Sequence, residues 1–182
     1  MVVDAHAIIA EYYRAGARLT TILLDHSRRV RDKALMVADR VAHLQPDRTF
    51  IAEAALLHDI GICRTSAPVI HCNGGHPYIC HGVIGRGMLE SSGLTRHALV
   101  CERHVGVGIS KEDIQRQGLP LPLRDMQPVE LEEAIVCYAD KFYSKTRGCH
   151  EQTLEAIVAD LMRFGQDKVD RYLHWHMLFG AN

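Results

Sequence analysis

The chain has 182 residues, of which 47% are hydrophobic and 24% are charged, and its formal net charge is −1. This length suits one domain with a full apolar core, and the composition is that of an ordinary globular protein. The balanced charge gives no electrostatic reason to expect binding to nucleic acid or to an anionic membrane. No apolar run approaches the roughly 20 residues that a membrane-spanning helix needs, so we expect neither partner.

The first residues, MVVDAHAIIAEYYR, predict a helix rather than a secretory signal, because they carry an early aspartate and lack a basic stretch before a long apolar core. We therefore expect a cytoplasmic protein whose six cysteines are reduced. None of the cysteines forms a Cys-x-x-Cys pair, which argues against zinc-ribbon and thioredoxin-like sites. The twelve histidines are an excess that points toward metal chemistry.

Helical periodicity runs through most of the chain, and no segment shows the two-residue alternation of a strand. The sequence therefore predicts an all-α protein. The expected helices span 3–15, 20–44, 48–59, 81–91, 95–104, 128–146, 151–163 and 166–178. Two long loops remain, 64–80 and 105–127, and the second has one helical turn near 111–116. Loops of this length in a compact domain are often functional.

Residues at several helix ends have identifiable roles. Asp47 is expected to cap the helix over 48–59, and Gly61 to stop it in a left-handed conformation. Gly93 separates two helices. Pro128 suits the first position of the helix over 128–146.

Histidines and aspartates extend the apolar faces of these helices. His26 lies four residues before Val30 on the buried face of its helix, and His58 continues the face formed by Ile51 and Ala55. Asp140 stands in AIVCYADKF, a segment that is apolar nearly all round and therefore predicts a buried helix. A buried carboxylate is costly unless it is paired or coordinated, so this position favours a cation nearby.

A single inward histidine is more often a hydrogen-bonded core residue than a ligand, and an inward aspartate can simply cap a helix or pair with an arginine. Five helices that direct such residues inward favour one metal centre over five separate explanations. The candidate metal ligands are His26, His58, Asp59, His81, His104 and Asp140.

The order and context of these six residues resemble the HD superfamily of metal-dependent phosphohydrolases. The segment DHSRRVRDKAL resembles its first motif, and AALLHDIG is close to its signature. His81 in CHGVIGRGML and His104 in CERHVGVGI match the two extra histidines of its two-metal branches, such as the HD-GYP phosphodiesterases and the symmetrical diadenosine tetraphosphate hydrolases. The GYP segment is absent and RHVG carries one histidine instead of an adjacent pair, which argues against cyclic-dinucleotide hydrolysis.

The resemblance covers about 20–145 and implies one HD-type helical bundle over 1–182, with helices in 151–178 packed on its core. It implies that His26, His58 and Asp140 hold one ion, that His81 and His104 hold a second, and that Asp59 bridges them. One or two divalent transition metal ions are expected, with Fe or Mn favoured and Co, Ni, Zn or Mg as alternatives.

The activity implied is hydrolysis of a nucleotide or another small phosphoester by a metal-bridging hydroxide, which Asp59 would orient as the catalytic ligand. Four cations near the ligands are candidates for binding the substrate phosphate, although each also fits a solvated surface charge. They are Arg64, Arg103, Lys141 and Lys145.

Other interpretations remain open at this stage. The segment HCNGGHPYICH could hold a structural zinc ion through His71, Cys72, His76, Cys80 and His81. The chain could instead be a non-catalytic nucleotide-binding module or a di-iron oxygenase of the same superfamily. The segment DRYLHWHMLF could pack internally or form a homodimer, and internal packing is favoured.

Overall fold

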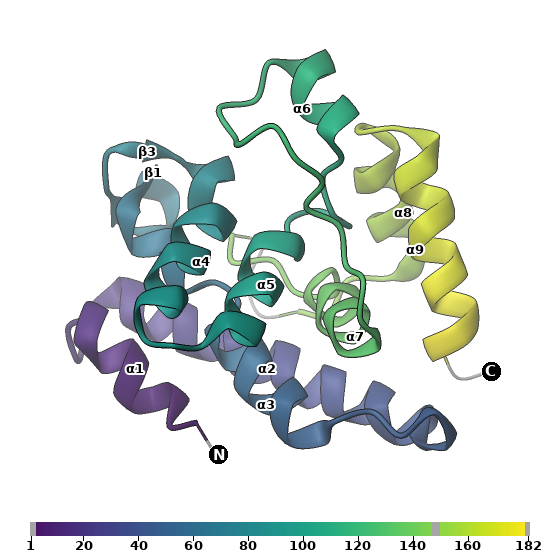
Figure 1. The fold of residues 1–182 in the computed structure, drawn as a ribbon, viewed down its shortest axis with the longest axis horizontal. Coiled ribbons are helices and arrows are strands. Elements are labelled where there is room, and N and C mark those ends of the chain that lie inside the picture. Colours follow the sequence, from purple (N-terminus) through teal and green to yellow (C-terminus); the bar gives the residue numbers. More distant parts are fainter. Residues whose placement is uncertain (1–2, 147–149, 181–182) are drawn as a thin grey trace.

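The computed structural model describes residues 3–146 and 150–180. Helices dominate this part of the chain, as the sequence predicts (Figure 1). The α-helices are α1 (Ala5–Tyr12), α2 (Arg18–Arg40), α3 (Arg48–Leu57), α4 (His81–Ser91), α5 (Thr95–Arg103), α6 (Lys111–Gln117), α7 (Leu131–Asp140), α8 (Leu154–Met162) and α9 (Gln166–Phe179). Short 3₁₀ helices η1 (Ala42–Leu44), η2 (Ile60–Arg64), η3 (Pro68–Ile70) and η4 (Tyr78–Cys80) lie between them.

Two apolar clusters hold the helices together, and both draw on α2 and α3, which pack side by side (Figure 1). The first joins them to α7, α8 and α9, and the second joins them to α1, η2, α4 and α5. Val30, Ala34 and Val37 are fully buried on the face of α2 that the sequence predicts, whereas Leu44 is 47% exposed because α2 ends at Arg40. Both clusters therefore border the helices that carry the buried histidines and aspartates.

The segment predicted as loop 64–80 contains a small sheet of β1 (Thr65–Ala67), β2 (Cys72–Asn73) and β3 (His76–Pro77), in the order β2-β1-β3. Strand β1 is antiparallel to β2 and parallel to β3. The expectation of no strand is therefore wrong here, because strands of two or three residues are too short to show an alternating pattern. The helical turn expected near 111–116 is confirmed by α6, which Ser110 caps.

Several predicted helix ends are confirmed and others are corrected. Asp47 caps α3, since its Oδ1 accepts a hydrogen bond of 3.0 Å from Phe50 N. Gly93 has a φ of 74° between α4 and α5, which fits its predicted role as a separator. Pro128 precedes the helix instead of opening it, because α7 begins at Leu131. This helix also ends at Asp140, well before the predicted end at 146.

Gly61 does not stop α3 in a left-handed conformation, because it is not among the described residues with positive φ. The chain continues from α3 directly into η2. Glycine is needed at this position for a different reason: a Cβ would lie 2.1 Å from His81 O and 2.5 Å from Gly85 N. The absence of a side chain therefore lets η2 contact α4 backbone to backbone.

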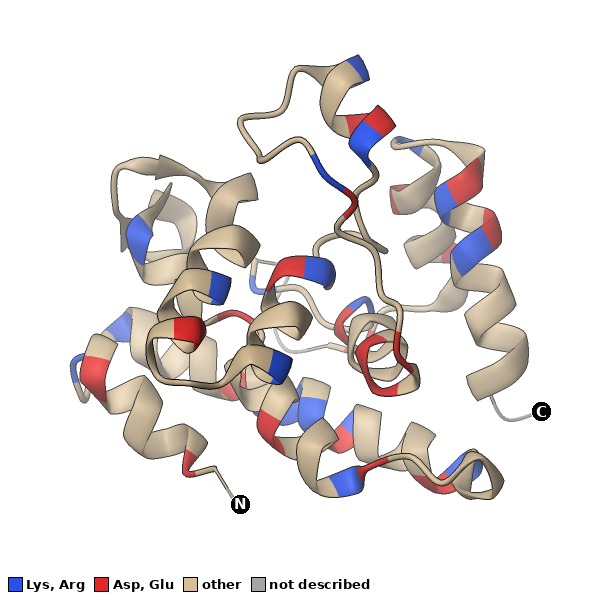
Figure 2. Ribbon diagram, in the orientation of Figure 1, with Lys and Arg blue, Asp and Glu red and all other residues tan. Residues whose placement is uncertain are grey.

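The C-terminal helix packs on the rest of the molecule, as the favoured interpretation of the tail expects. Tyr172 of α9 stacks on Tyr138 of α7 with ring centroids 5.2 Å apart, and Phe179 meets the same tyrosine edge-on. A buried ion pair between Lys168 and Asp113 ties α9 to α6. Figure 2 shows that basic and acidic residues are interspersed along the helices. Within 3–146 and 150–180, no helix is both long enough and apolar enough to cross a bilayer.

Candidate metal centre

The ends of four helices and the middle of a fifth converge on one buried point. His58 caps the C-terminus of α3, with Asp59 next to it, and His104 caps α5. The remaining residues are His26 in α2, His81 at the first position of α4 and Asp140 at the last position of α7. All six are buried, with His58 and Asp59 fully so. The structure thus brings together every residue that the sequence predicts as a ligand.

Backbone carbonyls set the orientation of three of the histidines. In His58, His81 and His104, Nδ1 lies 2.7–2.8 Å from the carbonyl oxygen three residues earlier, on Ala55, Tyr78 and Cys101. A carbonyl can only accept, so Nδ1 carries the proton and Nε2 is turned inward. This second hydrogen bond is the usual support of a histidine that binds a metal through its other nitrogen.

The first group of ligand atoms comes from His26, His58, Asp59 and Asp140. His26 Nε2 lies 3.0 Å from Asp140 Oδ1 and 3.2 Å from Asp59 Oδ2. His58 Nε2 lies 3.0 Å from Asp59 Oδ2 and 3.3 Å from His26 Nε2. Ligands that share one ion at about 2.1 Å stand roughly 3.0–3.4 Å apart in octahedral or tetrahedral geometry, so these spacings fit a single small cation.

The second group comes from Asp59, His81 and His104. The Nε2 atoms of the two histidines lie 3.2 Å apart, and they lie 3.4 and 3.5 Å from Asp59 Oδ1. Asp59 is the one residue common to both groups. Its Oδ2 faces the first group and its Oδ1 the second, which is the arrangement that a bridging carboxylate requires.

The charges around the cluster keep its carboxylates ionised. Burial raises the pKa of Asp59, but the positive charges of Lys145 and His58 outweigh this effect and hold the pKa well below its usual value. Burial likewise opposes ionisation of Asp140, and Lys141 together with hydrogen bonding to His26 lowers its pKa well below the usual value. Both residues therefore present negatively charged oxygens to any cation bound between them.

The imidazoles of the second group are electrically neutral. Burial lowers the pKa of His81 to about 3 and also lowers the pKa of His104. Burial has the same tendency at His58, but the adjacent carboxylates of Asp59 and Asp140 reverse it and raise that pKa to about 9. Neutral imidazoles are the form that binds metals, and a proton on His58 would have to leave when a metal ion binds there.

The donor set fits divalent metal ions. Both oxygens of Asp59 are buried, and neither accepts a well-formed hydrogen bond from a described residue, although Lys145 pairs with Oδ2. At the second group, two imidazole nitrogens face each other and the Oδ1 oxygen of Asp59, and no lysine or arginine of the described residues pairs with that oxygen. Mixed nitrogen and oxygen ligands suit Mn, Fe, Co, Ni or Zn.

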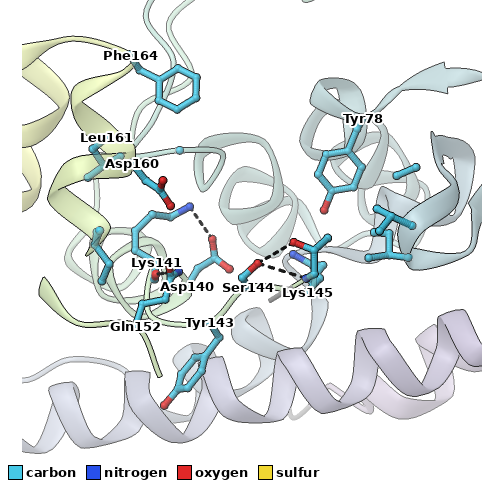
Figure 3. Close-up of a pocket in the computed structure, with 16 residues that line it drawn as sticks. Tyr78, Asp140, Lys141, Tyr143, Ser144, Lys145, Gln152, Asp160, Leu161 and Phe164 are labelled. Atoms are coloured by element: carbon cyan, nitrogen blue, oxygen red, sulfur yellow. Dashed lines mark hydrogen bonds and ion pairs between the residues drawn. The ribbon is translucent and has the colours of Figure 1, made fainter. Parts of the chain in front are cut away.

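A cavity of about 510 Å³ opens beside the cluster, between the β1–η4 segment and α8 (Figure 3). Asp140, Lys141 and Lys145 line its polar end. Lys141 Nζ lies 2.9 Å from Asp140 Oδ2, and Lys145 is ion-paired with Asp59. These two lysines therefore occupy the boundary between the buried ligands and the cavity.

The two predicted phosphate-binding arginines lie elsewhere. Arg103 Nη1 contacts both carboxylate oxygens of Glu133, at 2.7 and 3.0 Å, and Arg64 is exposed at the end of η2. Neither lines the cavity beside the cluster. Adjacency in sequence to a metal ligand is a weak guide, because neighbouring residues on a helix point about 100° apart.

Sequence reasoning missed two residues that do line cavities at the cluster. The Tyr78 hydroxyl points into the large cavity, and burial raises the pKa of this group to about 12, which keeps it protonated (Figure 3). Arg29 lines a second, smaller cavity together with His26 and Lys145. Arg29 could have been predicted, because it lies three residues after His26 on the same helix and therefore on the same face. Tyr78 had no such signal, because its placement depends on the small sheet.

The alternative of a structural zinc site in residues 71–81 is not supported. Among the described residues, neither candidate ligand group contains His71, Cys72, His76 or Cys80. His71 and His76 are exposed, and Cys80 Sγ lies 3.4 Å from Pro120 O. His81 belongs to the group with Asp59. Of the six cysteines, Cys149 lies outside the described residues, and the other five are free thiols.

Comparison with known families identifies this geometry. The HD-domain family matches residues 23–144, which is well over half of the chain and contains all six clustered residues. The chain belongs to the HD-domain family. This is a family of metal-dependent phosphohydrolases, and the buried histidine and aspartate cluster of this chain is consistent with a metal site.

Three curated proteins are similar to this HD protein over part of their length. This chain is 37% identical over 113 residues to a tRNA (cytidine(56)-2′-O)-methyltransferase from Picrophilus torridus. The match covers 61% of this chain and 29% of that protein. An uncharacterised protein of Methanocaldococcus jannaschii is 38% identical over 102 residues, covering 56% of this chain and 53% of that protein. The methyltransferase of Thermoplasma volcanium is 27% identical over 175 residues, which are 95% of this chain and 46% of that protein. The chain thus spans only part of the length of each relative.

Solved structures show the same HD fold. The HD domain of the Listeria monocytogenes phosphodiesterase PgpH superposes with a TM-score of 0.56 and 15% identity, covering 97% of this chain and 86% of that one. The same domain in complex with cyclic-di-AMP superposes with a TM-score of 0.52 and 13% identity, covering 89% and 93%. At this level of identity the likeness establishes the fold.

Proposed function

We propose that this chain is a metal-dependent phosphohydrolase that acts on a nucleotide or a similar small phosphoester. The observation that carries the proposal is the position of Asp59, whose two oxygens face two separate groups of buried ligands. A pair of divalent ions in such a site supplies Lewis acidity and a water molecule of lowered pKa for attack on phosphorus.

The side chains of this HD protein are suited to hold such ions and would leave coordination positions for water. His26, His58 and Asp140 would bind one ion, His81 and His104 the other, and Asp59 would bind both. The carbonyl contacts of His58, His81 and His104 fix the ring orientations before any ion arrives. Pre-oriented ligands keep the cost of ordering the site low, which favours tight binding.

Lys141 and Lys145 would hold the substrate phosphate. In the absence of ions their ammonium groups neutralise Asp140 and Asp59. When those carboxylates bind ions instead, two positive charges are left at the polar end of the cavity, where an anionic group can reach them. The Tyr78 hydroxyl, protonated and directed into the same cavity, can donate a hydrogen bond to a phosphate oxygen.

The size of the cavity supports a small-molecule substrate. About 510 Å³ lies within the range of sites that take ligands the size of a nucleotide. The PgpH domain of the same fold has been solved with cyclic-di-AMP, which supports a nucleotide as the class of ligand. The missing GYP segment and the single histidine of RHVG argue against a cyclic dinucleotide in this chain.

The test is a metal analysis followed by a substrate screen. Protein purified without chelator should contain one to two transition metal ions per chain. Nucleoside mono-, di- and polyphosphates and simple phosphoesters are then assayed for phosphate release, with Mn, Fe, Co and Mg supplied in turn. Phosphate release that depends on the metal, and that chelation removes, is the expected result.

Three outcomes would contradict the proposal. A chain that binds none of these metals has no metal centre. A chain that binds metals and nucleotides without turnover is a nucleotide-binding module, and one that consumes dioxygen without releasing phosphate is an oxygenase.

Replacing Lys145 with methionine should weaken substrate binding while the metals remain. A charge-assisted hydrogen bond contributes about 1.5–3 kcal/mol, so we expect KM for a hydrolysed phosphoester to rise about 10- to 100-fold. The metal content of the variant, measured by elemental analysis, should match that of the native chain. The control is Lys111→Met, which removes an exposed lysine from the start of α6. An unchanged KM in Lys145→Met would exclude the phosphate-binding role of this residue.

A further inference from the structure

The cavity beside the metal cluster has two chemically different ends. Its inner end is polar and carries Asp140, Lys141 and Lys145. Its outer wall carries the apolar side chains of Ile157, Leu161 and Phe164. Figure 3 shows Leu161 and Phe164 on the side of α8, across the cavity from Tyr78, with Asp160 of the same helix lying toward Lys141 at the inner end. Among the described residues that line the cavity, no lysine or arginine stands on the α8 wall. A ligand that fills the whole cavity therefore has an anionic end and an uncharged apolar end.

Phe164 is the unusual residue of this wall. Ile157 and Leu161 are 2% and 5% exposed, whereas Phe164 is 54% exposed. It lies in the turn between α8 and α9, where Phe164 N bonds Leu161 O at 2.9 Å and Gly165 N bonds Met162 O at 3.3 Å. An aromatic ring placed by an ordered turn at the mouth of a cavity offers a flat apolar surface on which another ring can stack.

The position of this wall in the sequence separates it from the catalytic part of the family. The HD-domain match ends at residue 144, and α8 with Phe164 lies beyond it. The match contains all the clustered metal ligands. Proteins of one fold often differ in specificity through segments outside the part they share. Here the HD domain would carry the chemistry, and α8 with Phe164 would contact the rest of the substrate.

We propose that Phe164 and Leu161 form a subsite for a flat, uncharged ring of the substrate, such as a nucleobase, while the phosphate lies at Lys141 and Lys145. This inference rests on the proposed function for the location of the phosphate. It narrows the substrate to a phosphoester that carries a ring-bearing group, because the described residues of the α8 wall offer no lysine or arginine to a second phosphate at that end of the cavity. Phe164 would be a specificity-determining residue that takes no part in the reaction.

Equilibrium binding to the Mn-loaded full chain tests the subsite without requiring turnover. The probes are AMP and CMP, which carry a base, and ribose 5-phosphate, which has the same sugar and phosphate without one. The native chain should bind at least one of the two nucleotides about 10-fold more tightly than ribose 5-phosphate. Stacking on an aromatic residue contributes roughly 1–3 kcal/mol per base. Phe164→Ala should therefore weaken the binding of that nucleotide about 10-fold and leave the binding of ribose 5-phosphate unchanged.

Two further variants separate a binding role from a structural one. Phe164→Trp keeps an aromatic face and should retain nucleotide affinity. Met162→Ala removes a side chain that is 48% exposed in the same region and does not line the cavity, so it should have no effect. The subsite is wrong if nucleotides bind no more tightly than ribose 5-phosphate, or if Phe164→Ala weakens all probes equally. Tight nucleotide binding without hydrolysis would leave the subsite standing and overturn the proposed function alone.

Discussion

Replacing Asp59 with alanine will remove both metal ions and, with them, the activity. Asp59 is the residue shared by the two ligand groups, so its loss affects both. Asp140, the other carboxylate of the cluster, belongs to the first group only and would not replace the bridge. We expect elemental analysis to give close to no bound metal, and phosphate release to fall by at least about 10³-fold. The assay uses whichever metal and substrate give the highest rate in the native chain.

The matched variant is His104→Ala, which takes one ligand from the second group only. It should keep the ion held by His26, His58 and Asp140 and lose the other, so its metal content should fall by about half. Asp32→Ala on α2, where the carboxylate is 64% exposed and paired with Arg31, controls for the loss of an acidic residue. If Asp59→Ala and His104→Ala lose the same amount of metal, Asp59 does not bridge two ions. Far-ultraviolet circular dichroism establishes that each variant remains helical.

The part of this site that could be predicted from the sequence is the part that depends on helical periodicity. His26 and Asp140 lie on long apolar faces, so their burial follows from the identity of the residues one turn away. The convergence of five elements on one point is a tertiary property, and no local pattern contains it. It could be expected only because the motifs resemble those of a known family.

The incorrect prediction for Arg103 and the missed residue Tyr78 have a common physical cause, which is contact between segments that are distant in sequence. Arg103 directly precedes His104 in the sequence, but its side chain points toward α7. There it pairs with the carboxylate of Glu133. Tyr78 enters the cavity because the strand directly before it, β3, pairs with β1. A strand pairing of two residues leaves no periodic signal, and the packing of α5 beside α7 is a tertiary contact, so neither placement could be derived from the sequence.

Gly61 shows how a residue can be singled out correctly for the wrong reason. Glycine after an apolar helix usually indicates a left-handed end, and this expectation is general. Here the backbone does not adopt that conformation, and the small size of glycine is what matters. Two backbones approach each other at Gly61, and the contact fixes the distance between the His58–Asp59 corner and the first turn of α4, which carries His81.

Substituting Gly61 with alanine should therefore damage both stability and metal binding. The added methyl group would lie 2.1 Å from His81 O and 2.5 Å from Gly85 N, and both are backbone atoms that cannot rotate away. Overpacking of this kind costs about 3 kcal/mol or more, which corresponds to a fall in Tm of roughly 6–12 °C for a chain of this size. The clash forces η2 and α4 apart and displaces His81 from Asp59. The variant should therefore retain the ion of the first ligand group better than the ion of the second.

The control for this substitution lies on the same helix as the contact. Gly87 is exposed in α4, and a Cβ there meets no atom within 4 Å. Alanine favours a helix over glycine by about 0.5–1 kcal/mol, so Gly87→Ala should raise Tm by roughly 2 °C and leave the metal content unchanged. Opposite signs for two glycine-to-alanine changes, measured by thermal melting and elemental analysis, would link the close packing of η2 on α4 to the second metal position. Equal effects in both variants would show that helix propensity alone governs them, and that the contact at Gly61 does not position His81.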